Sequence, residues 1–261
     1  MNKLLRIIRV CVIALFSSAG LHAHAAAPLR IMCLGDSITA GYTDNPDWQV
    51  PFEFGYRSGL YRRLTEAGYV FQFVGASPEP WNGVFGRPRN KPVLDLRALN
   101  QDHHRGYGGW GTQQLSTHVR DWLAIDKPDV VLLMVGINDD GSVAARKNIK
   151  NIIDTIVSAS PAADVIVAQL TPMAQFSQNI VDFNFFIRTT LVPSFKAQGK
   201  RVTTVDQYAN LMADRAIDPS RYSNGINHPN SSTYERIAQT WFDGIALIRP
   251  LNAPKNMKIA R

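Results

Sequence analysis

The stretch "LRIMCLGDSITAGYTD", residues 29–44, decides how the rest of the chain is interpreted. Its first half is apolar without alternation, which is typical of a strand buried on both faces of a parallel sheet. The run ends at Gly35 and Asp36, after which the residues turn polar. Ser37 therefore follows a predicted buried strand, and it is either a nucleophile held there or a hydroxyl in an ordinary turn.

Further apolar runs of strand length recur along the chain and alternate with segments of helical spacing. The predicted strands cover residues 29–35, 69–76, 128–136, 163–170 and 201–207. The predicted helices cover residues 54–68, 112–125, 142–159, 178–198 and 231–248. This alternation predicts an α/β fold, a three-layer α/β/α sandwich with a doubly wound, five-stranded parallel sheet.

The first 25 residues have the pattern of a secretory signal peptide. A basic start precedes an apolar run of about a dozen residues, and residues 23–25 have the A-x-A form of a cleavage site. The apolar run is shorter than the ~20 residues that a membrane-spanning helix needs. We therefore expect residues 1–25 to be a signal peptide, residues 26–261 to form one domain, and the protein to reach the periplasm or the extracellular medium.

The charge pattern argues against nucleic acid as a partner. The chain has 28 Lys and Arg against 21 Asp and Glu, a net charge of +7. Three of these basic residues lie in the predicted signal peptide, so the charge falls to +4 without it, and no Lys/Arg run remains. Cys11 lies in the same segment, which leaves Cys33 alone and excludes an internal disulfide.

One predicted connection is unusually long. Residues 77–108 show no strand or helix pattern and are rich in Pro, Gly and Arg. Loops of this length in a compact domain are usually functional or disordered. Because Trp81, Phe85 and Tyr107 lie in it, we favour an ordered rim of an active site over a mobile surface insertion.

Three connections bring polar groups to one edge of the predicted sheet, because ligands of doubly wound sheets bind outside the carboxyl ends of the strands. Ser37 follows the first strand, and Asn138 follows the third. The glycine-rich stretch "GYGGWGT" (106–112) ends the connection after the second strand. A hydroxyl, glycine amides and a carboxamide suit acyl transfer, in which the serine attacks and the N–H groups stabilise the developing oxyanion.

A base is needed to activate the serine, and only four histidines lie beyond the predicted signal peptide. His228 lies in a Gly/Asn/Pro loop just before the last helix, from where it can reach over the strand ends. His118 is interpreted as a half-buried surface histidine in mid-helix, whereas His103 and His104 lie in the long loop, within reach of a substrate. No metal-ligand spacing such as CxxC or HExxH occurs, so no metal or other cofactor is expected.

Four short blocks of the chain resemble, in order, those of the SGNH (GDSL) hydrolases. They are "GDSIT" (35–39), "GYGGWGT" (106–112), "GIND" (136–139) and "HPN" (228–230). The stretches "LRIMCLGDSITAG" (29–41), "YRSGLYRRLTEAGYVFQFVG" (56–75) and "RGYGGWGT" (105–112) are most similar to the acetylxylan-esterase-type carbohydrate esterases of that family.

The resemblance covers about residues 29–245 and implies the flavodoxin-like fold of the family. It implies Ser37 as the nucleophile and His228 as the general base. It further implies an oxyanion hole formed by the amide of Ser37, the N–H of Gly109 and the side chain of Asn138. Such donors each contribute about 10²–10³ to kcat.

One position departs from the family pattern. These hydrolases usually carry an Asp three residues before the histidine, where it orients the imidazole, but this position is Gly225 here. Asn224 is one candidate for the same role, since an asparagine orients the catalytic histidine of papain-like enzymes. The alternatives are a backbone carbonyl, a Ser–His pair without a third member, or a carboxylate from elsewhere, the nearest in sequence being Asp206, Asp214 and Asp218.

The leading hypothesis is an exported serine esterase that removes a small acyl group, with acetyl expected, from a carbohydrate. Trp48, Trp81 and Trp110 lie in predicted loops at strand ends, where they either stack on sugar rings or pack the loops together. One alternative keeps the chemistry but changes the substrate to a lipid ester, a thioester or an aryl ester. The other is a non-catalytic carbohydrate-binding protein on a decayed hydrolase scaffold.

Overall fold

The computed structural model describes residues 27–42, 54–79, 93–213, 216–222 and 226–251. Several sequence predictions concern positions outside these ranges: the signal peptide (1–25), Trp48, Trp81, Phe85, Asp214, Asn224 and Gly225. Within the described ranges, no helix has both the length and the apolar character needed to cross a membrane.

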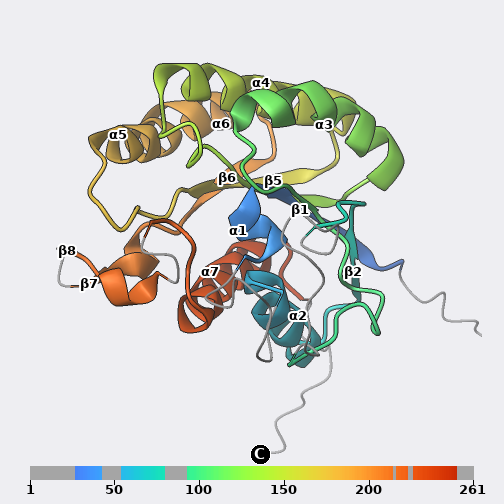
Figure 1. The fold of residues 1–261 in the computed structure, drawn as a ribbon. Helices are drawn as coiled ribbons and strands as arrows, with labels where there is room; N and C mark the ends of the chain where they lie inside the picture. Colours follow the sequence, from blue (N-terminus) through green and yellow to red (C-terminus); the bar gives the residue numbers. More distant parts are fainter. Residues whose placement is uncertain (1–26, 43–53, 80–92, 214–215, 223–225, 252–261) are drawn as a thin grey trace, which may run out of the picture.

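The centre of the molecule is a parallel sheet with the strand order β2-β1-β4-β5-β6, and a short β3 also pairs with β1 (Figure 1). The strands are β1 (Leu29–Gly35), β2 (Phe71–Val74), β3 (Arg105–Gly106), β4 (Val130–Met134), β5 (Asp164–Gln169) and β6 (Val202–Asp206). The five predicted strands are confirmed. The sixth, β3, has two residues and pairs with Leu34 and Gly35, beyond the point where β2 stops pairing with β1.

Helices cover both faces of the sheet, as expected for a doubly wound fold. They are α1 (Ser37–Ala40), α2 (Tyr56–Glu66), α3 (Thr112–Asp126), α4 (Val143–Ala159), α5 (Gln178–Phe186), α6 (Val192–Ala197) and α7 (Ser231–Ile248). Figure 1 shows α3, α4, α5 and α6 on one face and α1, α2 and α7 on the other. A π-helical turn (Ile187–Leu191) joins α5 to α6, so the helix predicted over 178–198 is one continuous helical segment made of α5, the π-helical turn and α6. The three-layer α/β/α sandwich is therefore confirmed.

Burial explains why these segments fold as they do. All five residues of β4 are buried, since helices cover both faces of the strand. On α4, the predicted stripe of Ile149, Ile152, Ile153 and Ile156 is at most 1% exposed. Each such side chain contributes about 1.5–3 kcal/mol by leaving water. The core therefore fixes the sheet and leaves the loops at its carboxyl edge free to carry polar groups.

The long connection over residues 77–108 is structured where it is described. Leu96 is fully buried against Phe54. The side chain of Gln101 accepts a hydrogen bond from the N–H of Phe73 at 2.9 Å and donates one to the carbonyl of Phe71 at 3.2 Å. This part of the connection is thus fastened along the outer edge of β2.

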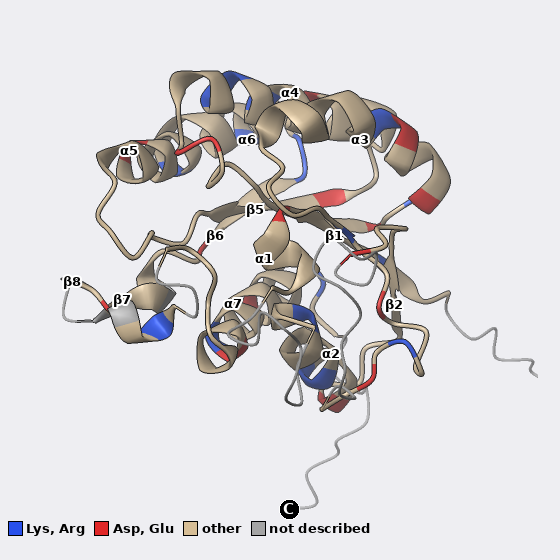
Figure 2. Ribbon diagram, viewed as in Figure 1, with Lys and Arg blue, Asp and Glu red and all other residues tan. Residues whose placement is uncertain are grey.

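A small two-stranded sheet follows β6, formed by β7 (Met212–Ala213) and β8 (Ala216–Ile217). Charged side chains of both signs are dispersed over the helices and loops rather than gathered by sign (Figure 2).

Candidate functional site

The turn after β1 holds Ser37 at the carboxyl edge of the sheet. Asp36 caps α1, because its Oδ1 accepts a hydrogen bond from the N–H of Ile38 at 3.0 Å. Ser37 is the first residue of α1 and is 3% exposed. A Cβ on Gly35 would lie 2.2 Å from the carbonyl oxygen of Met134, so only glycine lets this turn pack against the end of β4.

Asp36 is buried beside the serine and carries less negative charge at pH 7 than an ordinary aspartate. Its side chain is 1% exposed, and burial raises the pKa of the carboxyl to about 7. Oδ2 is buried without a hydrogen-bond partner among the described residues. The carboxyl is therefore partly neutral at pH 7, which suits a site where negative charge must develop on a substrate oxygen.

His228 reaches Ser37 from the opposite end of the chain. Its Nε2 lies 2.9 Å from Ser37 Oγ. The loop that carries it is held by a hydrogen bond from the N–H of Ala174 to the carbonyl of Ile226 at 2.6 Å. Asn230 then caps α7 by accepting a hydrogen bond from the N–H of Thr233 at 3.0 Å. The structure therefore brings together the two residues that the sequence singled out for nucleophile and base.

The surroundings of His228 favour its neutral form. Burial lowers the pKa of the imidazole to about 4. The ring of Tyr42 packs edge-on against it, with centroids 5.4 Å apart and planes at 82°. A neutral imidazole has one ring nitrogen free to accept a hydrogen bond, so Nε2 is placed to accept the Ser37 hydroxyl proton.

The structure restricts which of the candidate carboxylates can orient His228. Oδ1 of Asp206 accepts hydrogen bonds from the N–H groups of Tyr208 and Ala209, at 3.0 and 3.2 Å. The carboxylate of Asp218 bonds to Ser220 and Arg221. Within the described chain neither carboxylate bonds to His228, while Asn224 and Asp214 lie outside the described residues.

The glycine-rich stretch over residues 106–112 packs against the turn after β1 that carries Ser37, which is called the serine turn below. The N–H of Tyr107 donates to the carbonyl of Gly35 at 3.1 Å. A Cβ on Gly106 would lie 2.4 Å from the backbone nitrogen of Ala40. Gly109 has a φ of +73°, which favours glycine, and a Cβ built there would meet no atom of the described chain within 4 Å. Its backbone is therefore open to a ligand at this edge.

Asn138 lies in the turn after β4 and bonds to the same stretch. Its Nδ2 donates to the carbonyl of Trp110 at 2.8 Å, which leaves a second N–H on the same nitrogen. The neighbouring Asp139 accepts a hydrogen bond from the N–H of Thr112 at 2.7 Å. These two contacts hold the turn carrying Asn138 against the stretch carrying Gly109.

Glu79 and Tyr42 were not found from the sequence, yet they connect both sides of the site. Glu79 is 7% exposed, and its Oε2 accepts hydrogen bonds from Tyr42 Oη at 3.0 Å and from the N–H of Gly108. Tyr42 packs on His228, and Gly108 precedes Gly109. One buried carboxylate therefore holds the aromatic neighbour of the histidine and the glycine-rich stretch together.

The other histidines that the sequence offered as candidates form contacts within the protein. His104 is 1% exposed, and its Nδ1 accepts a hydrogen bond from the N–H of Gly106 at 2.9 Å. Its Nε2 must then carry the proton and donate it to the carbonyl of Glu79 at 2.7 Å. Burial holds the pKa of His104 well below its usual value. His104 is thus neutral and links Glu79, near the start of the long connection, to Gly106, near its end, rather than contacting a substrate.

His103 and His118 also lie in contacts of their own. The ring nitrogens of His103 lie 3.1 Å from the carbonyl of Gly75 and 3.1 Å from Asn100 Oδ1. His118 is exposed rather than half-buried, and it stacks on Trp122 with centroids 5.4 Å apart.

Arg57 was also not identified from the sequence, and its side chain supports the serine turn through hydrogen bonds. The guanidinium is fully buried and donates to the carbonyls of Thr39 and Ala40, at 3.2 and 3.0 Å, and of Asp102 at 2.7 Å. Two of these carbonyls end α1. The cation therefore interacts favourably with the negative end of that turn and links it to the long connection.

Trp110 packs within the protein. Its ring stacks on Tyr107 with centroids 4.3 Å apart and planes at 19°. His118 lies beside it at 5.3 Å. This contact favours the packing interpretation for Trp110. Among the residues that the structure describes, no group of three or more His, Cys, Asp or Glu is arranged to hold a metal ion.

Comparison with known proteins places the chain among hydrolases. Residues 33–236 match the model of the GDSL-like Lipase/Acylhydrolase family. A solved structure described as Clostridium thermocellum family 3 carbohydrate esterase is 27% identical, with a TM-score of 0.67 over 87% of this chain and 100% of that one. A carbohydrate esterase family 3 structure from Talaromyces cellulolyticus, 21% identical, shares the fold with a TM-score of 0.61 over 86% of this chain and 100% of the other.

A curated relative, the multidomain esterase of Ruminococcus flavefaciens, is 25% identical over 268 residues. The match takes in 90% of this chain but only 31% of that protein.

Proposed function

Since the chain belongs to the GDSL-like lipase/acylhydrolase family and is a carboxylic ester hydrolase, we propose that it removes small acyl groups, chiefly acetyl, from a carbohydrate. The observation that carries the proposal is the 2.9 Å contact between Ser37 Oγ and His228 Nε2, at the same sheet edge as Gly109 and Asn138. The export predicted from residues 1–25 is part of the proposal, since it brings the enzyme to polymers outside the cell.

The proposed reaction begins with the transfer of the Ser37 proton to His228 Nε2 as Oγ attacks the ester carbonyl carbon. The resulting oxyanion is stabilised by the amides of Ser37 and Gly109 and by the side chain of Asn138. His228 then gives its proton to the departing sugar oxygen, and an acyl-serine remains. A water molecule, deprotonated by His228, then attacks the acyl carbon, and His228 returns this proton to Ser37 Oγ as the acid is released.

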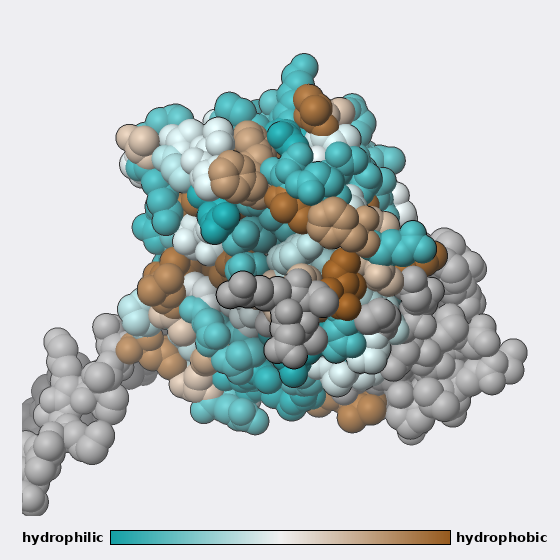
Figure 3. All heavy atoms as spheres, turned by 90° about the vertical axis from the view of Figure 1, so that its left-hand side faces the viewer, coloured by the Kyte–Doolittle hydropathy of each residue, from teal (hydrophilic) through white to brown (hydrophobic). Residues whose placement is uncertain are grey.

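A polar substrate suits the face at which β5 ends and α5 begins. Figure 3 views the molecule from the side where α5, β7 and β8 lie, and brown apolar and teal hydrophilic residues are interspersed there. Together with the family 3 carbohydrate esterase as a structural neighbour, this supports a short acyl group on a sugar.

The proposal is tested by the acyl preference of the purified enzyme. We expect turnover of p-nitrophenyl acetate and of acetylated xylo-oligosaccharides, a lower rate on butyrate and little turnover of octanoate, all dependent on Ser37. A preference for octanoate would transfer the assignment to lipid esters. Sugar binding without Ser37-dependent turnover of any of these esters would support the non-catalytic alternative.

The pH dependence of kcat/KM should reflect the buried histidine. Only the neutral imidazole accepts the serine proton, so activity is lost as the pH falls through the pKa of His228, which burial lowers to about 4. The acid limb should therefore lie well below the ~6.5 of an ordinary histidine. It is measured from the rate of acetate release across the acid range. An acid limb at or above the ordinary value would mean that a partner stabilises the imidazolium and outweighs burial.

Replacing the predicted side-chain oxyanion donor should slow the chemical step more than it weakens binding. We expect Asn138→Ala to lower kcat by about 10²–10³-fold with a small change in KM, since the lost hydrogen bond forms mainly in the transition state. Asn151→Ala, which removes an exposed amide from α4, is the matched control and should leave kcat unchanged. Equal kcat in the two variants would remove Asn138 from the oxyanion hole.

A further inference from the structure

We infer that a pocket beside the catalytic edge is a binding subsite for a second sugar ring of the acylated carbohydrate. The pocket has a volume of about 200 Å³ and lies where β5 and β6 end. Five of the lining residues carry the argument: Gln169 and Asp206 end the two strands, Phe185 and Arg188 lie in α5 and in the π-helical turn after it, and Tyr208 follows β6. This inference rests on the proposed function, because it names where that substrate extends beyond the ester.

The side chain of Gln169 is the first indication of a ligand. It is 8% exposed and lines the pocket, yet its amide has no hydrogen-bond partner within the described part of the chain. The Gln169 amide is not among the fully buried polar atoms that lack a partner, so it reaches the solvent in the pocket and can exchange water for a ligand. The amide of Asn184 is instead used within the protein, since it bonds to both the N–H and the carbonyl of Leu170, at 2.6 and 2.9 Å. Gln169 thus presents one acceptor and two N–H donors to whatever occupies the pocket.

The rest of the lining has the chemistry that recognises a sugar. Asp206 uses Oδ1 for its own turn and has Oδ2 available. Phe185 is 58% exposed, and the Arg188 guanidinium lies 5.8 Å from its ring centroid. Planar polar groups pair with adjacent hydroxyls, and the apolar C–H face of a pyranose packs on an aromatic ring. At about 200 Å³ the pocket is smaller than the roughly 300–1,000 Å³ of drug-sized ligand sites, which suits a single ring.

The pocket also lies at a suitable place relative to Ser37. β5 is separated from β1 by β4 alone, which is a lateral step of about 10 Å at the usual strand spacing. The turn carrying Asn138 is fastened to the start of α5, since Asp140 accepts hydrogen bonds from Ser177 Oγ and Asn179 Nδ2, at 2.6 and 2.8 Å. A ring whose ester lies at Ser37 therefore has the pocket about two strands away, within reach of a neighbouring ring in the same chain.

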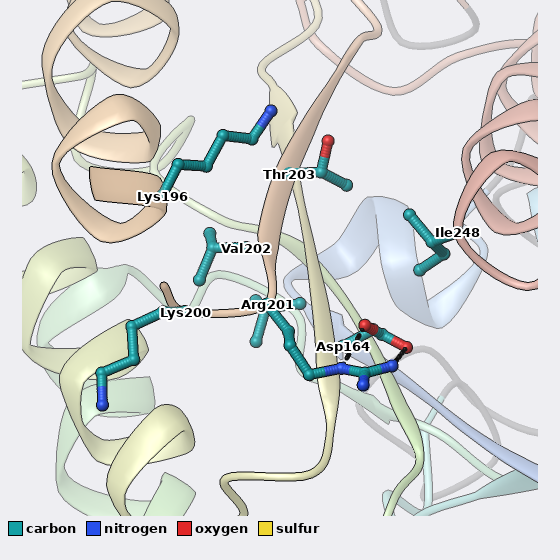
Figure 4. A pocket seen from close by; sticks show the side chains of 8 residues that line it. Asp164, Lys196, Lys200, Arg201, Val202, Thr203 and Ile248 are labelled. Atoms are coloured by element: carbon teal, nitrogen blue, oxygen red, sulfur yellow. Dashed lines mark hydrogen bonds and ion pairs between the residues drawn. The ribbon is translucent and has the colours of Figure 1, made fainter. Parts of the chain in front are cut away.

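A larger pocket at the other end of β5 and β6 lacks these features. It is lined by Asp164, Arg201 and two lysines (Figure 4). Arg201 forms a bidentate ion pair with Asp164, at 2.7 and 2.8 Å, so that carboxylate is already paired. Lys196 and Lys200 point away from each other in Figure 4. No set of unpaired polar groups converges there.

The test uses the full chain and compares a ladder of acetylated xylo-oligosaccharides, from one to four sugars, with p-nitrophenyl acetate. The variants are Phe185→Ala and Gln169→Met, and the control is Ile125→Ala, an exposed residue at the far end of α3. We expect the wild type and the control to gain kcat/KM with the second sugar. In both pocket variants, kcat/KM for substrates with two or more sugars should be about tenfold lower because KM is higher, while turnover of p-nitrophenyl acetate is unchanged. Equal length dependence in all four proteins would overturn the subsite.

Binding measured without turnover separates this inference from the proposed function. Calorimetric titration of unacetylated xylotetraose should show binding to the wild type and to Ile125→Ala, and much weaker binding to Phe185→Ala. This result supports the subsite even if no ester is hydrolysed, in which case the esterase proposal fails alone. Absence of xylotetraose binding in an enzyme that hydrolyses p-nitrophenyl acetate would overturn the subsite and leave the esterase proposal intact.

Discussion

Ser37→Ala is expected to lower kcat/KM for acetyl esters by about 10⁴–10⁶-fold, because the variant has no atom to form the acyl-enzyme bond. The side chain is nearly buried and loses only its hydroxyl, so the fold should be retained. The measurement is the initial rate of p-nitrophenyl acetate hydrolysis, together with the midpoint of thermal unfolding for each protein.

The control for this variant is Ser116→Ala, which removes a serine hydroxyl from α3. It should keep the wild-type rate. If Ser37→Ala retained a tenth or more of the wild-type kcat/KM while Ser116→Ala behaved as expected, the nucleophile would have to be another residue.

His228→Ala should cause a loss of the same order, about 10⁴–10⁶-fold, because an unassisted serine hydroxyl is a weak nucleophile at neutral pH. The residual rate should rise with pH as hydroxide replaces the base, in place of the plateau that a neutral imidazole gives above its pKa. The pH profiles of kcat for the variant and the wild type, compared on acetate esters, provide this check.

His118→Ala is the matched control, since His118 is exposed on α3 and its ring stacks on Trp122. We expect it to change kcat by less than twofold. A His228→Ala enzyme with a normal rate and a normal pH plateau would be incompatible with His228 as the base.

The strands could be predicted because their signal is local. A strand covered on both faces is apolar almost without interruption, as four of the five runs are, whereas residues 201–207 include Thr203, Thr204 and Asp206 and gave a weaker signal. β3 was not predicted because it has only two residues, Arg105 and Gly106, and they pair with β1 through the tertiary fold. The helix over 178–198 was predicted as one element, while its π-helical turn depends on packing that periodicity does not reveal.

The candidate site was predictable where a residue directly follows a strand or precedes a helix. Ser37, Asn138 and His228 have such positions, and the topology then brings them to one edge. Glu79 and Tyr42 have no comparable signal, because their hydrogen bond joins residues 37 positions apart in two irregular segments. Gln169 ends a strand and reads as an ordinary strand residue until the structure shows that its amide has no partner in the described part of the chain.

The nucleophile is identified most directly by the residue that a serine-directed reagent modifies. The enzyme is treated with phenylmethylsulfonyl fluoride, which modifies activated serines, and the labelled peptide is identified by mass spectrometry. We expect one label, on Ser37, which forms in step with the loss of esterase activity and is absent from His228→Ala. Complete inactivation with the label on another residue, or full activity after Ser37 is labelled, would contradict it.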